Sequence, residues 1–160
     1  MADKIRWCIR QKRGIELIEP SENLAKAYLQ KAEKALESMK ANEGNTEWEI
    51  PSGYYAMYFS VYAILMRLGV KSEIHSCTIE FVRVYLNEYF TDEEMELLAT
   101  SQEARIDAQY YVGRRINIRI HQKIIREAPD LMIKCKNILP KISDSKIGEI
   151  REDLRKKISG

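Results

Sequence analysis

At 160 residues the chain has the length of a single domain, and it can bury a core without support from a metal or a disulfide. Charged residues make up 31% and hydrophobic residues 45%, which excludes an intrinsically disordered chain. The 26 Lys+Arg and 24 Asp+Glu leave a net charge of +2, whereas dedicated nucleic-acid-binding domains are usually far more basic.

The cysteines and the apolar segments favour a soluble cytoplasmic protein. Cys8, Cys77 and Cys135 are isolated, odd in number and without a C-x-x-C spacing. This pattern argues against a disulfide framework or a zinc site and suits a reducing cytoplasm. The first residues are too charged for a secretory leader. The most apolar stretch, residues 54–68, is too short to span a bilayer, so we expect no membrane association.

The chain is expected to form long helices, because it contains only seven glycines and four prolines to interrupt them. Between residues 22 and 43 apolar side chains recur every three or four positions. This spacing predicts an amphipathic helix with Ser21 as its N-cap and Gly44 at its end. Residues 42–51 form a loop in this prediction. The segment after them is apolar on nearly all sides as far as Gly69, which predicts the central helix of a bundle.

Two further helices are expected next. Apolar side chains of residues 75–90 share one helical face. Thr91 and Glu94 then match a capping box, in which each residue satisfies a backbone N–H of the other. The sequence therefore predicts a further helix over residues 92–111.

The last helix of the bundle is expected after a break near Gly113. Ile116, Ile120 and Ile124 lie on one of its faces. Pro129 is expected to kink or split it, because proline lacks the N–H that the helix needs and clashes with the preceding turn.

These elements predict an all-α fold, an up-and-down bundle of about five helices with short connections and no strand. Residues 1–142 form a single bundle domain in this prediction. Residues 143–160 are mostly polar and form a C-terminal tail or a short, frayed helix.

The sequence carries no cofactor or metal motif. It has no phosphate-cradling glycine loop and no nucleophile elbow, and two histidines are too few for a multi-histidine metal site. His75, at an expected helix start, is a candidate anion contact, acid or base. The alternative is a helix-entry residue that backbone hydrogen bonds satisfy.

His121 allows a different function, metal-independent RNA cleavage. One helical class of ribonuclease places an arginine about four to six residues before a histidine; the arginine holds the scissile phosphate and the histidine moves the proton of the 2′-hydroxyl. Arg114 and Arg115 formally fit, with six and five residues standing between each of them and His121. In an arginine-rich stretch such a spacing also arises by chance.

A basic stripe is expected on the last bundle helix. It consists of Arg115, Arg119, Lys123 and Arg126, at helical spacing. Such a stripe can follow a phosphate backbone or dock on an acidic partner, or it can be a solvated face opposite the isoleucines.

The stretch ARIDAQYY combines a basic and an acidic residue, Arg105 and Asp107, with Tyr110. Tyr54 and Tyr55 of the central helix are candidate neighbours. Buried tyrosine hydroxyls need hydrogen-bond partners, so these residues form either a structural network or a ligand site.

Three stretches together carry a family resemblance. They are Ser52–Tyr58 (S-x-Y-Y-A-M-[YF]), the turn that contains Lys71, Ser72 and His75, and Arg105–Tyr110 (R-x-x-A-x-Y). They resemble a prokaryotic branch of the HEPN domain family, small helical bundles often encoded beside minimal nucleotidyltransferases. The N-terminal stretch also resembles archaeal members, and the resemblance covers roughly residues 3–140.

The resemblance implies a five-helix bundle that pairs as a homodimer, with a groove for a nucleotide or RNA and a minimal nucleotidyltransferase as a partner. Ribonuclease members cut RNA with the arginine and histidine of an R-x(4–6)-H motif. Arg105 takes the place of that arginine, but Tyr110 takes the place of the histidine. A phenol, with a pKa of about 10, cannot exchange a proton at pH 7 as imidazole does.

We therefore expect a binding module rather than an enzyme, in which Arg105 contacts a phosphate or a partner carboxylate. Its expected surroundings are Tyr54, Tyr55, His75, Asp107 and Tyr110. The alternative is an endoribonuclease toxin that uses Arg114 or Arg115 with His121.

Overall fold

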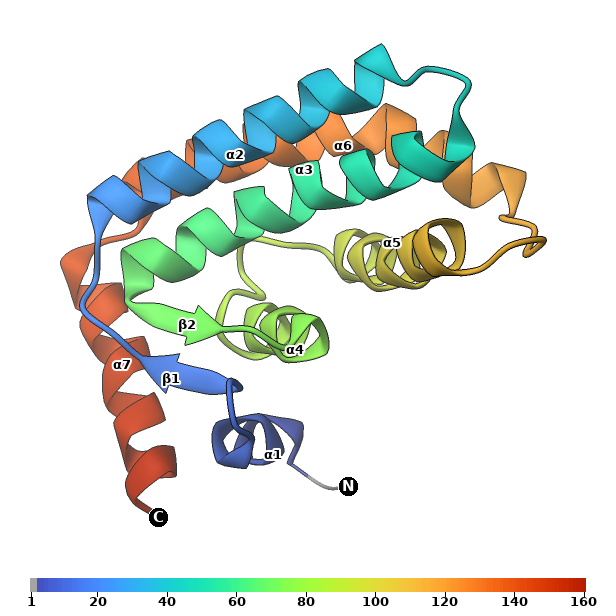
Figure 1. Ribbon diagram of the computed structural model, residues 1–160. Coiled ribbons are helices and arrows are strands. Elements are labelled where there is room, and N and C mark those ends of the chain that lie inside the picture. Colours follow the sequence, from blue (N-terminus) through green and yellow to red (C-terminus); the bar gives the residue numbers. More distant parts are fainter. Residues whose placement is uncertain (1–2) are drawn as a thin grey trace.

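Figure 1 shows the computed structural model, which describes residues 3–160. Within these residues the chain forms seven α-helices, a single 3-10 turn and one small two-stranded sheet. In chain order the elements are α1 (Lys4–Arg10), β1 (Ile15–Leu17), α2 (Glu22–Ala41), α3 (Thr46–Leu68), β2 (Val70–Ser72), α4 (His75–Tyr85), α5 (Asp92–Tyr110), α6 (Ile118–Ile138), η1 (Leu139–Lys141) and α7 (Asp144–Ser159).

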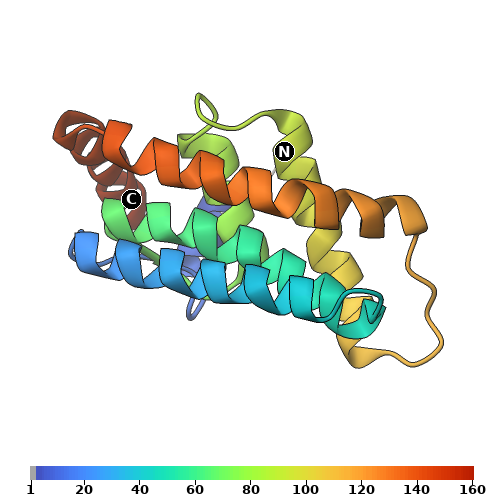
Figure 2. The same cartoon turned by 90° about the horizontal axis from the view of Figure 1, so that it is seen from above.

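Helix α3 is the centre of the bundle, as its apolar sequence predicts. It packs against α2, α5 and α6, and its side chains are buried on nearly all sides from Ile50 to Leu68. Seen from above in Figure 2, α2, α3 and α6 lie side by side as one layer. Helices α4 and α5 cover the other side of α3 (Figure 1). The predicted all-α bundle is confirmed.

Local capping signals set several of the helix ends. The Ser21 side chain accepts a hydrogen bond from the N–H of Leu24 at the start of α2. Thr91 and Glu94 form the predicted capping box of α5. Gly69 ends α3 in the left-handed conformation (φ 73°), where its N–H reaches the carbonyls of the last turn.

The structure corrects the prediction that the chain has no strand. β1 and β2 pair in antiparallel register, with Ile15 opposite Ser72 and Leu17 opposite Val70. Each strand has only three residues, too few for an alternating pattern to appear in the sequence. The pairing ties the N-terminal segment to the turn that leads from α3 into α4.

Two helices, each with an internal proline, differ from the prediction. Helix α3 begins at Thr46, inside the predicted loop, and includes Pro51; the complete burial of Ile50 stabilises this first part of the helix. Helix α6 runs unsplit past Pro129. It begins only at Ile118, so Arg115 precedes the helix and is not part of a stripe along it.

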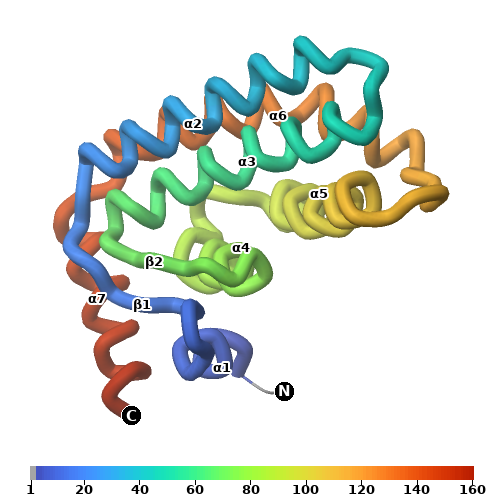
Figure 3. Tube along the Cα trace, in the orientation of Figure 1, coloured from blue at the N-terminus to red at the C-terminus, as the bar shows by residue number. Residues whose placement is uncertain are grey.

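The C-terminal residues form α7, which has a buried face of Ile147, Ile150 and Leu154. Arg151 fastens this helix to the strand region, because its Nη1 donates to the carbonyls of Ile18 (2.8 Å), Leu68 (3.2 Å) and Gly69 (2.8 Å). Helix α7 also contacts α1, and these two helices lie on the same side of the helical layer (Figure 3).

The expectation that the cysteines are unpaired is wrong. Cys8 of α1 and Cys77 of α4 form a disulfide with a Cα–Cα distance of 5.7 Å, and both are fully buried. Only Cys135 is a free thiol. The partners are 69 positions apart, so no spacing in the sequence indicates the pair. The cysteine-based argument for a reducing cytoplasm is therefore lost.

None of the helices found between residues 3 and 160 is both long and apolar enough to cross a membrane.

Candidate functional site

Arg105 is a buried cation on the face of α5 that packs against α3. The residue is 8% exposed. Its guanidinium carbon lies 5.3 Å from the ring centre of Tyr54 and 5.5 Å from that of Tyr55. Its Nη1 donates hydrogen bonds to the hydroxyl of Tyr55 (3.2 Å) and to the carboxamide oxygen of Gln109 (3.3 Å).

Arg105 has no counter-ion in the part of the chain that the structure describes. It forms no ion pair with a residue between 3 and 160, and its Nε is buried without a hydrogen-bond partner. One helical turn earlier, the hydroxyl of Ser101 is also buried without a partner. Burial of a charge without a partner costs several kcal/mol as an order of magnitude, and ring contacts compensate only in part. An anion beside Arg105 would remove much of this cost.

His75 completes the surroundings of the guanidinium. Its Nδ1 lies 2.7 Å from the hydroxyl of Tyr54, and its ring stacks on that of Tyr58 at a centroid distance of 4.1 Å. We call Arg105, Tyr54, Tyr55 and His75 the Arg105 cage. Its members come from α3, α4 and α5.

Tyrosines at every fourth position of α3 connect this cage to the segment of β2 and α4. The hydroxyl of Tyr54 meets His75, that of Tyr58 lies 2.9 Å from Oγ1 of Thr78, and that of Tyr62 accepts from the N–H of Ser72 (3.1 Å). A spacing of four residues places all three hydroxyls on one helical face. We call these contacts the tyrosine ladder.

Burial keeps Arg105 the only charge of the cage at neutral pH. Desolvation, and then the positive charge of Arg105, lowers the pKa of His75 to about 4. Burial raises the pKa values of Tyr54 and Tyr58. Neutral imidazole and phenol groups around one guanidinium suit anion binding, whereas a histidine with so low a pKa is a weak general base at pH 7.

Two of the residues expected around Arg105 lie elsewhere. Tyr110 is 66% exposed and makes neither a hydrogen bond nor a ring contact with Arg105. Asp107 accepts a hydrogen bond from Nη1 of Arg114 (2.7 Å). The residue that does reach Arg105 is Gln109, which helical geometry explains because positions four apart share a face and positions five apart do not.

His121 belongs to a second cluster, at the start of α6. Its Nε2 donates to Oε1 of Glu49 over 2.6 Å. Glu49 is in the first turns of α3 and only 3% exposed. This pairing holds the imidazole ring in one orientation, and Nδ1 forms no hydrogen bond with the described residues. Sequence reasoning missed Glu49, since 72 positions separate it from His121.

Arg114, Arg115 and His121 line one hollow of about 430 Å³. The guanidinium of Arg114 stacks on the ring of Tyr111, at 3.5 Å from its centre, and is neutralised by Asp107. Arg115 is exposed and forms no ion pair with the described residues. Of the two arginines that line this hollow, Arg115 is therefore the one without an ion pair among the described residues.

No group of three His, Cys, Asp or Glu side chains between residues 3 and 160 is placed to hold a metal ion.

The family model of the HEPN domain matches residues 25–139, which include most of α2, all of α3 to α6 and both clusters. The chain belongs to the HEPN domain family. No curated protein matches it. Helix α1, β1 and α7 lie outside the matched part of this HEPN domain, and so does Cys8, whereas its partner Cys77 lies inside.

Proposed function

We propose that this HEPN domain is a nucleotide- or RNA-binding module that holds a phosphate group at Arg105. The single observation that carries the proposal is the buried guanidinium without a carboxylate partner among the described residues. Family membership supports the same class of ligand.

A phosphate can satisfy Arg105 better than its present neighbours do. Both oxygens that Arg105 contacts are neutral, and they lie at 3.2 and 3.3 Å, toward the long end for such bonds. Gln109 is an exposed side chain, so an anion can displace it at low cost. Phosphate oxygens accept two parallel hydrogen bonds from one guanidinium, and charge assistance makes these bonds stronger.

The geometry supports binding without cleavage at this site. Nδ1 of His75 is engaged by Tyr54, and the low pKa of His75 makes it a poor proton acceptor at pH 7. Tyr110 faces solvent.

Replacing Arg105 with Met is expected to weaken RNA binding by roughly 10- to 100-fold, the equivalent of one or two charge-assisted hydrogen bonds. The free energy of unfolding should stay the same or rise, because Met fills similar space without an unpaired charge. Fluorescence anisotropy with a short labelled single-stranded RNA measures the affinity, and chemical denaturation measures the stability.

Arg126→Met is the matched control, since Arg126 is an exposed arginine of α6. It removes the same charge and should lower affinity by no more than a few-fold. An Arg105→Met variant that binds RNA like the wild type but melts at a lower temperature would assign Arg105 a purely structural role.

A second candidate function, endoribonuclease activity, is favoured by the bond between Glu49 and His121 and by the hollow that His121 shares with Arg115. In this function Arg115 holds the scissile phosphate. The free Nδ1 of His121 takes the proton of the 2′-hydroxyl, and Glu49 orients the ring.

If the second function operates, RNA is cut in the presence of a metal chelator, and His121→Ala lowers the cleavage rate by about 100-fold or more. Glu49→Gln should lower it less. Gln122→Ala, an exposed neighbour on α6, is the control. Gel electrophoresis of labelled RNA measures the cleavage. RNA that stays intact with the wild-type protein excludes this function.

The proposed module acts as a homodimer and as an accessory partner of a minimal nucleotidyltransferase in the cytoplasm. What supports this is the resemblance of Ser52–Tyr58 and Arg105–Tyr110 to the corresponding HEPN branch. Arg119 and Arg126 are exposed on α6 and would face an acidic partner, so high salt should weaken the pairing.

A further inference from the structure

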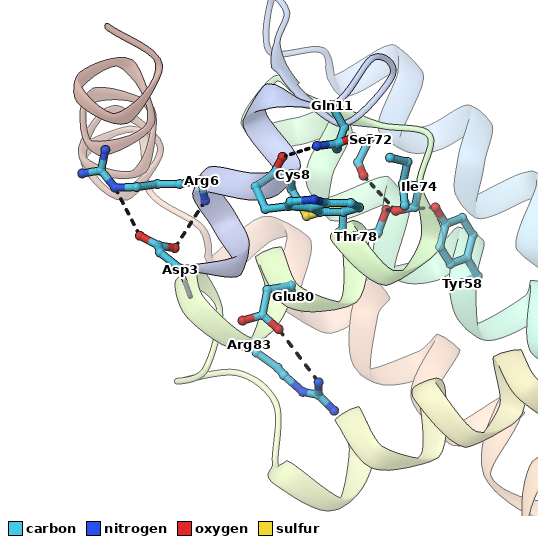
Figure 4. The surroundings of a disulfide bond; sticks show 12 residues. Asp3, Arg6, Cys8, Gln11, Tyr58, Ser72, Ile74, Thr78, Glu80 and Arg83 are labelled. Carbon is cyan, nitrogen blue, oxygen red and sulfur yellow. Dashed lines mark hydrogen bonds and ion pairs between the residues drawn. A yellow bond between two sulfur atoms is a disulfide. The ribbon is translucent and has the colours of Figure 1, made fainter. Parts of the chain in front are cut away.

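The Cys8–Cys77 disulfide attaches the N-terminal helix to the helix that carries His75. Figure 4 shows α1 and α4 joined at this bond, with Thr78 and Tyr58 on the side of α4 away from α1. Cys77 is fully buried and lies between His75 and Thr78, the two α4 residues of the tyrosine ladder. One turn of α4 therefore carries both the disulfide and the contacts that hold the Arg105 cage.

This turn depends on tertiary contacts because it has no side-chain cap. The residue before it is Ile74, which makes no capping hydrogen bond. The starts of α2, α5, α6 and α7 are all capped by a side chain. An uncapped first turn leaves helix N–H groups without intrahelical acceptors and frays easily. Here the disulfide on one side and the tyrosine ladder on the other hold it.

We propose that the Cys8–Cys77 disulfide is a redox lock on the Arg105 cage: oxidised, it keeps the first turn of α4 in place and access to the cage narrow, and its reduction loosens that turn and widens the access of an anion to Arg105. The mechanical coupling stands on the contacts alone; its effect on ligand binding rests on the proposed function.

The reductant required is a dithiol, such as a small dithiol or a dithiol protein. One of its thiolates attacks a cysteine sulfur and forms a mixed disulfide, and its second thiolate then releases the protein. Two electrons and two protons pass from the dithiol to Cys8 and Cys77, which become thiols, while the dithiol becomes a disulfide.

Attack on the buried sulfurs requires α1 to lift from α4. This helix has seven residues, of which only Ile5 and Cys8 are buried. Its ion pair, between Arg6 and Asp3, lies within its own first turn and does not fasten it to the bundle. Opening of such a short terminal element costs far less than global unfolding.

The test follows the imidazole resonances of His75 by NMR during a pH titration of the oxidised and the dithiothreitol-reduced protein. The titratable groups that face this ring are Tyr54, Tyr55, Tyr58 and Arg105. In the oxidised protein His75 should stay neutral to about pH 4, because its pKa is lowered to that value. After reduction its midpoint should move by at least one unit toward 6.5, the value of a solvated histidine.

The double variant Cys8→Ser/Cys77→Ser should reproduce the reduced titration and should not respond to dithiothreitol. Circular dichroism accompanies each sample. Identical His75 titrations before and after complete reduction, verified by mass spectrometry, would overturn the proposal. Loss of the whole helical signal on reduction would also overturn it, because the bond would then be a global staple and not a local lock.

Binding of a labelled single-stranded RNA in both redox states separates this inference from the proposed function. Tighter binding by the reduced protein, together with the shifted titration, supports both. A shifted titration with RNA binding absent in both states supports the lock and contradicts the binding function of Arg105.

Discussion

Replacing both Cys8 and Cys77 with serine is expected to lower the free energy of unfolding by about 4 kcal/mol, the chain-entropy value for a loop of this length. The bond joins residues 69 positions apart, so its loss frees almost half of the unfolded chain. Denaturant titrations of the oxidised wild-type protein and of the double variant measure the difference. A domain of ordinary stability survives such a loss but comes close to its limit at elevated temperature.

Reduced wild-type protein provides the control for this result. It should unfold at the same denaturant concentration as Cys8→Ser/Cys77→Ser, and the double variant should not change on addition of reductant. Cys135 is buried and unpaired in either state, so it does not confuse the comparison. Equal midpoints for oxidised wild type and double variant would contradict the expected stabilisation.

Gly69→Ala is expected to cost about 3 kcal/mol of stability, from two causes that add. Gly69 has a φ of 73°, a left-handed conformation that costs a side chain about 1 kcal/mol. A Cβ at this position would also lie 2.5 Å from the carbonyl oxygen of Ile18 and 2.7 Å from the nitrogen of Pro20. These are backbone atoms, which cannot move aside without a shift of the β1 segment; such overpacking costs roughly 1–3 kcal/mol.

Gly44→Ala is a matched control that separates the cost of the close Cβ contacts at position 69 from the cost of the left-handed backbone. Gly44 is also left-handed, with a φ of 84°, but a Cβ there meets nothing within 4 Å. It should cost only about 1 kcal/mol. The unfolding free energies of the two variants give the cost of the close approach as their difference. Equal losses would show that the turn at Gly69 relaxes freely.

The parts of the fold that were predicted from the sequence are those that local chemistry determines. Ser21, the Thr91–Glu94 capping box and Gly69 act within one helical turn, and the apolar pattern of the central helix reports its burial directly. Two strands of three residues are too short to show an alternating apolar pattern in the sequence. The disulfide joins cysteines whose separation follows no recognisable motif. Those features follow from which segments meet in space.

In the candidate site, too, local rules predict some of the neighbours, and contacts between distant segments determine the others. The sequence predicts Tyr54 and Tyr55 as neighbours of Arg105 because buried tyrosine hydroxyls need hydrogen-bond partners, and both rings lie beside its guanidinium. The four-residue helical spacing indicates Gln109 as a neighbour of Arg105, whereas the sequence-based prediction named Tyr110. The partner of His121 lies on another helix, and no local rule indicates it.

The hydrogen bonds of Arg151 bear on where this HEPN domain can be cut. A fragment limited to residues 25–139 would lack β1, which pairs with Val70–Ser72, and the guanidinium that satisfies the carbonyls of Leu68 and Gly69. It would also lack Cys8 and leave Cys77 as an unpaired thiol. The segments on either side of the family match thus stabilise the turn that enters α4. Measurements on a truncated protein would therefore describe an Arg105 cage that lacks these contacts.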